Sequence, residues 1–298
     1  MHAPADTSAR CGWWHRLHAW RWYARWPLKV AALALVVMLV LYPKVWLIPV
    51  WAARLNDLNS VVDPNDPALA PLEAEVRAQL APGTRLPAAL VPVEKVVYAH
   101  VPYAFDWDTW GVMDYLPTVA EVFAQGREDC DGRAVVATAL LQRLGYEAWL
   151  ACDLKHTWVA VRDPSLATAD SFELMAPGKG EKTLVGAGAG TRWSLTLGTF
   201  SNFGRALAFG IAVFPLGREI IILIALCAVL LQPRASPLRR IVGCAVLTGA
   251  LILLRVGGTA PSGMMLWAWL GVMAVVAGCL LLAVPRRTVH AGGRAETQ

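Results

Sequence analysis

A cysteine at the predicted start of a helix and a histidine at the predicted start of a strand are the residues best suited to chemistry. Cys130 follows Asp129, whose short carboxylate can accept hydrogen bonds from the free N–H groups of a helix N-terminus. The spacing predicts a helix over residues 134–144 that ends at Gly145, with Cys130 in its first turn, where the helix dipole favours a thiolate. His156 opens an apolar-rich segment for which we expect a strand. A thiol and an imidazole base are the two parts that a cysteine nucleophile needs.

The other cysteines point to packing. Cys227, Cys244 and Cys279 lie in long apolar runs, where cysteine behaves as a small hydrophobe. The chain has no C-x-x-C pair and no Cys/His spacing of the zinc-binding kind, so we expect no metal and no cofactor. Cys152 lies near Cys130 in the sequence, and a structural disulfide between them is the alternative to a reactive Cys130.

The composition is that of a membrane protein. Of the 298 residues, 56% are hydrophobic and only 16% are charged. Residues 1–29 interleave tryptophan with arginine, which would suit nucleic acid, but the apolar run that follows favours a segment at a membrane surface. We therefore expect a lipid bilayer as a partner and no nucleic acid.

Four spans are predicted, at residues 30–50, 215–232, 240–255 and 264–284. Pro43 is expected to kink or end the first, and Arg218 and Glu219 to lie at one interface. The leader, the loop at 232–240 and the tail at 285–298 carry most of the flanking Lys and Arg, which places both termini in the cytoplasm. The region between the first two spans then lies outside, on the periplasmic or extracellular side of a bacterial inner membrane.

That outer region is predicted to hold one compact α+β domain. Residues 52–94 form a lead-in with a helix at 69–80, and residues 181–214 a linker with an interfacial segment. The compact domain covers residues 95–180. Its first elements are a strand at 96–101 and a helix at 114–123, ahead of the helix that carries Cys130.

The order of these motifs resembles the transglutaminase-like superfamily, which includes animal transglutaminases, peptide N-glycanases and bacterial transglutaminase-like cysteine proteases. The resemblance rests on Gly126-x-x-Asp129-Cys130-Asp131, Leu144-Gly145 and His156-Thr157-Trp158-Val159, preceded by Tyr103-Ala104-Phe105-Asp106-Trp107. It covers roughly residues 100–177. It implies a papain/transglutaminase-like fold in which the helix carrying Cys130 packs on a small antiparallel sheet, here joined to four transmembrane helices.

The resemblance implies that Cys130 is the nucleophile and His156 its base, with the N–H of Cys130 and an indole such as Trp107 or Trp110 holding the oxyanion. The sequence departs from the family at its third catalytic residue. Where members carry an aspartate before a proline, this chain has Ala176-Pro177, and Gly132 replaces a second acid of many members. The missing acid weakens the orientation of His156 and leaves a dyad.

The expected function is therefore thiol acyl transfer, most simply hydrolysis of a peptide or isopeptide bond in a cell-envelope protein. The alternative is a domain of the same fold that has lost catalysis and acts as a membrane-tethered peptide-binding or scaffold protein. Reactivity of Cys130 that depends on His156 separates the two.

Overall fold

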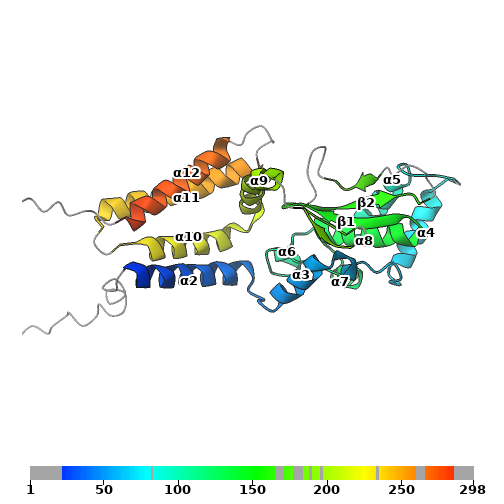
Figure 1. The fold of residues 1–298 in the computed structure, drawn as a ribbon, viewed down its shortest axis with the longest axis horizontal. Coiled ribbons are helices and arrows are strands. Elements are labelled where there is room, and N and C mark those ends of the chain that lie inside the picture. The colour runs from blue at the N-terminus through cyan, green and yellow to red at the C-terminus, as the bar shows by residue number, and fades with distance from the viewer. Residues whose placement is uncertain are drawn as a thin grey trace, which may run out of the picture. The chain divides into compact units, whose positions relative to one another are not determined.

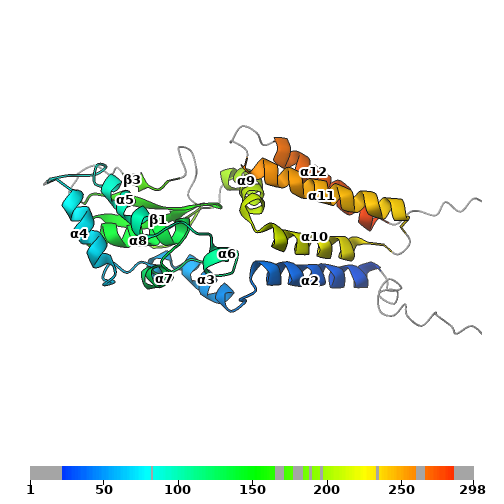
Figure 2. The ribbon, with the colours of Figure 1, turned by 180° about the vertical axis from the view of Figure 1, so that it is seen from behind.

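The computed structural model describes residues 22–81, 83–164, 171–176, 184–187, 190–194, 197–232, 235–259 and 266–284. The chain divides into two compact units. One, here called the outer unit, runs from Leu41 to Gly210. The other, the membrane unit, comprises the chain up to Val40 and from Ile211 onward. Figures 1 and 2 show the elements of both.

The outer unit is mixed α and β, with more helix than strand. Its helices are α3 (Leu47–Asn56), η2 (Leu58–Val61), α4 (Leu69–Gln79), α5 (Leu90–His100), α6 (Asp106–Thr109), α7 (Val119–Gln125) and α8 (Cys130–Arg143). Its strands are β1 (Glu147–Cys152), β2 (Thr157–Arg162), β3 (Phe172–Leu174), β4 (Val185–Gly186) and β5 (Arg192–Trp193). Helix α9 (Leu197–Val213) crosses the boundary between the units.

The strands form one antiparallel sheet in the order β3-β2-β1-β4-β5. Helix α8 packs on β1 and β2 (Figure 1), and its residues from Ala134 to Leu141 are all buried. Val159 and Val161 of β2 belong to the hydrophobic core that α8 shares with the sheet. The expected arrangement of a buried helix on a small antiparallel sheet is therefore present.

Local signals explain the limits of α8. The Asp129 side chain caps its start by accepting the N–H of Asp131, and Gly145 follows its end with φ +96°, the left-handed conformation that glycine adopts most easily. The predicted cap and glycine stop are both confirmed. The predicted helix over 134–144 begins earlier, because Cys130 is already its first residue.

Two predicted elements differ from the structure. The segment 96–101, expected as a strand, lies in α5, where Leu90, Val93, Val96 and Val97 bury one face at helical spacing. Valines favour strands, and tertiary packing overrides that preference here. The helix expected over 114–123 starts only at Val119, because Thr118 forms a capping box with Glu121.

The core of the outer unit reaches further toward the N-terminus than the predicted domain at 95–180. Leu58, Leu69, Leu72 and Val76, all from the predicted lead-in, are fully or almost fully buried in the same cluster as α8. The lead-in is therefore part of the folded unit and contributes to its stability.

The membrane unit contains α2 (Trp22–Leu41), α10 (Leu216–Leu230), α11 (Pro237–Thr259) and α12 (Leu266–Ala283). In the described parts of the chain, three helical segments are long and apolar enough to cross a membrane, namely Tyr23–Leu41, Pro237–Thr259 and Leu266–Ala283. The protein is a membrane protein on this ground. Ala206–Val213 and Leu216–Leu230 reach that length only as a pair, and they are bent by 113°.

The first spanning helix lies earlier than predicted. Helix α2 ends at Leu41, two residues before Pro43, and the last residues of the predicted 30–50 span belong to the separate helix α3, which starts at Leu47. Pro43 has no N–H to donate, so it ends the helix, as its place in the sequence indicates.

Arg218 and Glu219 are expected from the sequence to lie at one interface. The structure adds an ion pair between Glu219 and a residue of another helix. Glu219 is 6% exposed and pairs with Arg255 of α11. The same guanidinium donates to the backbone oxygens of Ile211 and Phe214, at 3.2 and 3.0 Å. Arg255 thus donates hydrogen bonds to carbonyl groups at the end of α9 and also neutralises the charge of Glu219.

Candidate functional site

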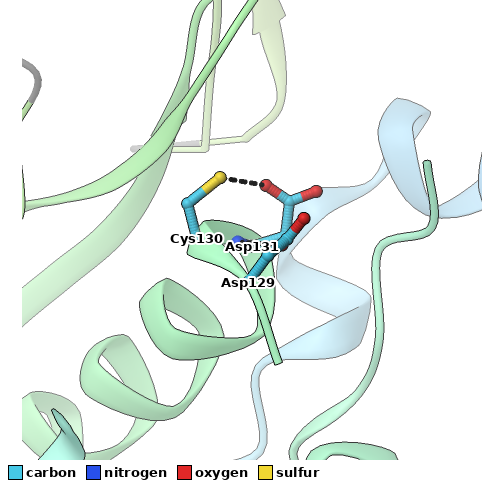
Figure 3. A group of neighbouring side chains, drawn as sticks. All are labelled: Asp129, Cys130 and Asp131. Atoms are coloured by element: carbon cyan, nitrogen blue, oxygen red, sulfur yellow. Dashed lines mark hydrogen bonds between the residues drawn. The ribbon is translucent and has the colours of Figure 1, made fainter. Parts of the chain in front are cut away.

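The start of α8 holds three reactive side chains in sequence, Asp129, Cys130 and Asp131 (Figure 3). Asp129 Oδ1 accepts the N–H of Asp131 at 3.0 Å, which fixes the first turn. The Cys130 thiol points to Asp131 and donates to its Oδ1 at 3.4 Å. The cysteine is therefore at the helix start, as predicted, and an acid faces its sulfur.

Burial and neighbouring carboxylates keep the Cys130 thiol protonated. Burial raises its pKa well above the usual value, and the charges of Asp131 and Asp129 raise it further. The nearby backbone N–H of Thr157 acts in the opposite direction. The expectation of a thiolate favoured by the helix dipole is thus wrong for this site, because desolvation and the two acids outweigh the dipole.

His156 is the last residue before β2, held in a turn by Asp153. Asp153 Oδ1 accepts the N–H of His156 at 2.8 Å, and the N–H of Asp153 donates to the His156 carbonyl at 2.9 Å. The ring lies nearly parallel to that of Trp158, with centroids 6.5 Å apart. The Nε2 atom lies 2.6 Å from the carbonyl oxygen of Met175.

The structure brings the two predicted residues close but does not bond them. The backbone N–H of Thr157, the residue directly after His156, lowers the pKa of the Cys130 thiol, and the charge of His156 lowers the pKa of Asp131. Among the contacts of the described residues, no hydrogen bond joins Sγ to a ring nitrogen of His156. Such bonds are often formed only once substrate is bound.

The face of β2 that meets α8 is the one that carries Thr157. The Thr157 side chain lowers the pKa of Asp131 at the start of α8. Trp158 lies outside the shared core, and its indole donates to Glu173 of β3 at 3.2 Å. The sequence alternation predicted that His156 and Trp158 cover the helix start, and Thr157 has that place instead.

The third catalytic position is occupied as the sequence indicates. Ala176 follows β3 and has no polar side chain, while Glu173 is bonded to Trp158. Asp163 is buried, and Asp170 lies outside the described residues. Within the described part of the chain, the partner of the His156 ring is a backbone carbonyl.

Three more acids surround the start of α8, and no spacing in the sequence groups them. The Trp51 indole donates to Asp114 at 3.1 Å, and the backbone N–H of Tyr115 donates to Asp106 at 2.6 Å. Glu128, which is fully buried, accepts from the Trp110 indole and from the N–H of Asp129. Carboxylate oxygens of Asp106, Asp114 and Asp131 lie within 4.8 Å of one another, so Asp131 completes the group. We call Asp106, Asp114, Glu128, Asp129 and Asp131 the acid cluster.

The acid cluster titrates far above the usual range of carboxyl groups. Burial, followed by the charges of the neighbouring acids, raises the pKa of Asp106 to about 12. Burial raises the pKa of Asp114 and of Glu128 to about 7 each. No salt bridge of the described residues joins this cluster to a lysine or arginine. Asp106 therefore holds its proton at neutral pH, and Asp114 and Glu128 titrate near it.

The acid cluster also contains the residues that could hold a metal ion. Ligand atoms lie within 4.8 Å of one another in three sets, Asp129 with Cys130 and Asp131, Asp106 with Asp114 and Asp131, and Asp106 with Glu128 and Asp129. Oxygen ligands of this kind suit Ca²⁺ or Mg²⁺. The acyl-transfer chemistry considered below does not require an ion.

The remaining candidates of the sequence are accounted for. Cys130 and Cys152 are both free thiols, so the structure does not form the alternative disulfide. The Trp110 indole is bonded to Glu128, and the Trp107 ring stacks on Phe105 with centroids 4.2 Å apart. Each indole thus has another partner. The backbone N–H of Cys130 remains the predicted hydrogen-bond donor to the oxyanion.

Comparisons with known proteins give no match for this chain. No family model, no curated protein and no solved structure matches it. The function is therefore argued from the site itself.

Proposed function

We propose that the protein is a membrane-anchored thiol acyl-transfer enzyme in which Cys130 is the nucleophile and His156 the base. One observation carries the proposal. Helix α8 packs on β2, and the backbone N–H of Thr157 is near enough to the Cys130 thiol to lower its pKa, so the thiol lies close to the residue next to His156 although 26 positions separate Cys130 and His156 in the sequence. A cysteine at a helix start beside a histidine at a strand start is the arrangement that cysteine nucleophiles use.

The resting thiol is protonated, so the base acts during the reaction. His156 Nδ1 takes the thiol proton as Sγ forms a bond to the carbonyl carbon of an amide. The imidazolium then returns the proton to the leaving nitrogen as the C–N bond breaks and a thioester remains. Water, deprotonated by the same histidine, attacks the thioester, and the carboxylate product leaves as Sγ regains its proton. The N–H of Cys130 stabilises the oxyanion.

The substrate class follows from the resemblance to the transglutaminase-like superfamily and from location. The packing of α8 on a small antiparallel sheet supports that resemblance. Peptide or isopeptide hydrolysis is the proposed reaction. The Lys and Arg pattern around the spans puts the outer unit on the periplasmic or extracellular side, with four spans when α10 and the end of α9 are counted as one. Proteins of the cell envelope are then its substrates.

The test is acylation of Cys130 in the full-length chain in detergent micelles. p-Nitrophenyl acetate is the probe, and trypsin releases residues 128–133, a peptide whose only cysteine is Cys130. General-base catalysis contributes roughly a hundredfold or more. We expect His156→Gln to slow acetylation of that peptide by at least about tenfold near neutral pH.

A matched control is available in the other histidine of the outer unit. His100 is bonded to Glu75 at 2.8 Å on the surface, away from the thiol. His100→Gln should acetylate at the wild-type rate. Equal rates for His156→Gln and wild type, with both proteins folded, would show that His156 does not activate Cys130 and would end the enzyme proposal.

A catalytically inactive, peptide-binding domain is the second candidate. The raised pKa of Cys130 and the acid that faces its sulfur favour it. This candidate predicts that Cys130 reacts no faster than the thiol of a small peptide and that His156→Gln changes nothing. The acetylation experiment thus separates both candidates in one measurement.

A further inference from the structure

The carbonyl of Met175 is the contact that holds the His156 ring. Met175 is the first residue after β3, whose ladder with β2 ends at the pair of Val159 and Leu174. Its φ of +61° makes it the only non-glycine residue of the described segments with positive φ. This backbone conformation is energetically unfavourable for a residue with a side chain, and it persists only where the surrounding structure holds it. It accompanies the placement of the Met175 oxygen 2.6 Å from His156 Nε2.

We propose that the Met175 carbonyl takes the place of the missing acid at Ala176 and positions His156 for catalysis. The inference rests on the proposed function for its catalytic part, while the contact itself does not. A carbonyl oxygen only accepts hydrogen bonds, so Nε2 carries the proton. The lone pair of the neutral ring is then on Nδ1, the atom that the proposed reaction needs as base.

A carbonyl and a carboxylate position the ring equally but stabilise its charge differently. Both accept from Nε2–H and so select one tautomer and one ring orientation. The carbonyl offers a dipole in place of a full negative charge. Met175 is therefore a positioning residue that acts through its backbone, and a substitution can remove its effect only by moving the backbone.

The surroundings of Met175 hold this conformation. Its side chain packs against the core of the outer unit, and the preceding Leu174 is 4% exposed on the same strand. On the other side of the bond, Asp153 fixes the backbone of His156. The donor and the acceptor are thus each held by structure that does not depend on the bond between them.

The experiment uses the full-length chain in detergent micelles with nitrogen-15 in its six histidines. The signals of His156 are those lost in His156→Gln. Nitrogen chemical shifts distinguish the two neutral tautomers directly, without reference to activity. We expect wild-type His156 to carry its proton on Nε2. A proton on Nδ1 in the folded wild-type protein would overturn the inference.

Two substitutions at position 175 sharpen the test. Valine is strongly disfavoured at positive φ because it is branched at Cβ, so Met175→Val should shift the carbonyl and give a mixture of tautomers. Glycine adopts φ +61° freely, so Met175→Gly should keep the proton on Nε2. If the valine variant fails to fold, wild type and the glycine variant still decide, because a glycine variant with mixed tautomers contradicts a role of the backbone alone.

Cys130 acetylation in the same variants separates this inference from the proposed function. Loss of one neutral hydrogen bond is worth about 1 kcal/mol, so Met175→Val should slow acetylation about fivefold, less than His156→Gln does. If His156→Gln slows the reaction and folded Met175→Val changes neither tautomer nor rate, the inference fails and the function stands. If the tautomer shifts in Met175→Val but neither variant slows the reaction, the contact stands and the function fails.

Discussion

Glycines inside helices make room for opposite kinds of side chain in the two units. In the membrane unit, Gly243 and Gly278 lie where an added Cβ would be 2.5 Å from Leu282 Cδ2 and 2.7 Å from Leu247 Cδ2. In the outer unit, an added Cβ on Gly132 would collide with Cγ and Cβ of Glu128. Helical glycines thus let two apolar helices pack closely in the membrane unit and let a glutamate side chain lie in the core of the outer unit.

Gly132 has no room for a larger side chain. Glu128 already fills the space beside Gly132. The carboxyl group beside position 132 comes from Glu128, and a second side chain at 132 would have no room. The glycine at position 132 thus reflects a packing constraint, and Glu128 supplies a carboxyl group next to it.

The two units also differ in how they compensate a buried acid. Glu219 has a cation, Arg255, directly against it. The acid cluster of the outer unit accepts N–H groups from indoles and from the backbone, and its carboxyl groups have raised pKa values. Charge pairing should therefore control the stability of the membrane unit, and pH that of the outer unit.

Arg255→Leu should have the largest effect on stability. The substitution leaves Glu219 buried without a cation and removes the bonds to Ile211 and Phe214, so we expect a loss of about 3–5 kcal/mol in the free energy of unfolding. Thermal unfolding in detergent micelles, followed by tryptophan fluorescence, measures it.

The double variant Glu219→Leu/Arg255→Leu tests the cause. It removes the acid together with its cation and should recover most of the lost stability. If the double variant melts as early as Arg255→Leu, the loss comes from the carbonyl contacts of Arg255 and the role of charge pairing is rejected.

Acidic pH should stabilise the outer unit. The pKa of Asp106 is raised from its ordinary value to about 12, so between these values the unfolded chain is ionised while the folded chain keeps the proton. The stability that this group contributes is complete below its unfolded pKa and is lost as pH rises toward its folded pKa. Asp114 and Glu128 add to the slope up to their folded pKa of about 7. Near-UV circular dichroism should show melting at lower temperature at about pH 8 than at about pH 5.

Asp106→Asn provides the control for this slope. Its neutral amide can keep the oxygen that accepts the N–H of Tyr115, and it has no proton to lose. The variant should be at least as stable as wild type at about pH 8, with a flatter pH dependence. A slope as steep as that of wild type would assign the pH dependence to other groups.

Local signals in the sequence were sufficient for the elements that carry the predicted dyad. Asp129 and Gly145 mark the ends of α8 through their own backbone preferences, and the strand around Trp158 has the expected composition. Prediction failed for α5, because burial of one helical face outweighed the strand preference of its valines.

The site could be predicted only in part, because most of its contacts join distant segments. Asp106, Asp114 and Asp131 converge through tertiary packing, and no spacing in the sequence announces it. The raised pKa of Cys130 follows first from its burial in the folded chain and then from the adjacent Asp131 and Asp129. The Met175 carbonyl is a backbone atom that any residue type supplies, so only its geometry reveals its role.

The smallest predicted effect concerns the glycines of the α11–α12 pair. Gly243→Ala places a methyl group against Leu282, and overpacking of this kind costs about 1–3 kcal/mol. Gly249 of the same helix has nothing within 4 Å of an added Cβ, so Gly249→Ala should leave the free energy of unfolding unchanged or raise it by less than about 1 kcal/mol.

Thermal unfolding in the same detergent compares the two alanine variants. Because both replace one glycine of α11, the difference between them isolates the contact with Leu282 from helix propensity. Equal melting temperatures would mean that Leu282 turns aside at little cost. The glycines would then not set the approach of the two helices, and the contrast with Gly132, which faces the inner carbons of Glu128, would rest on the outer unit alone.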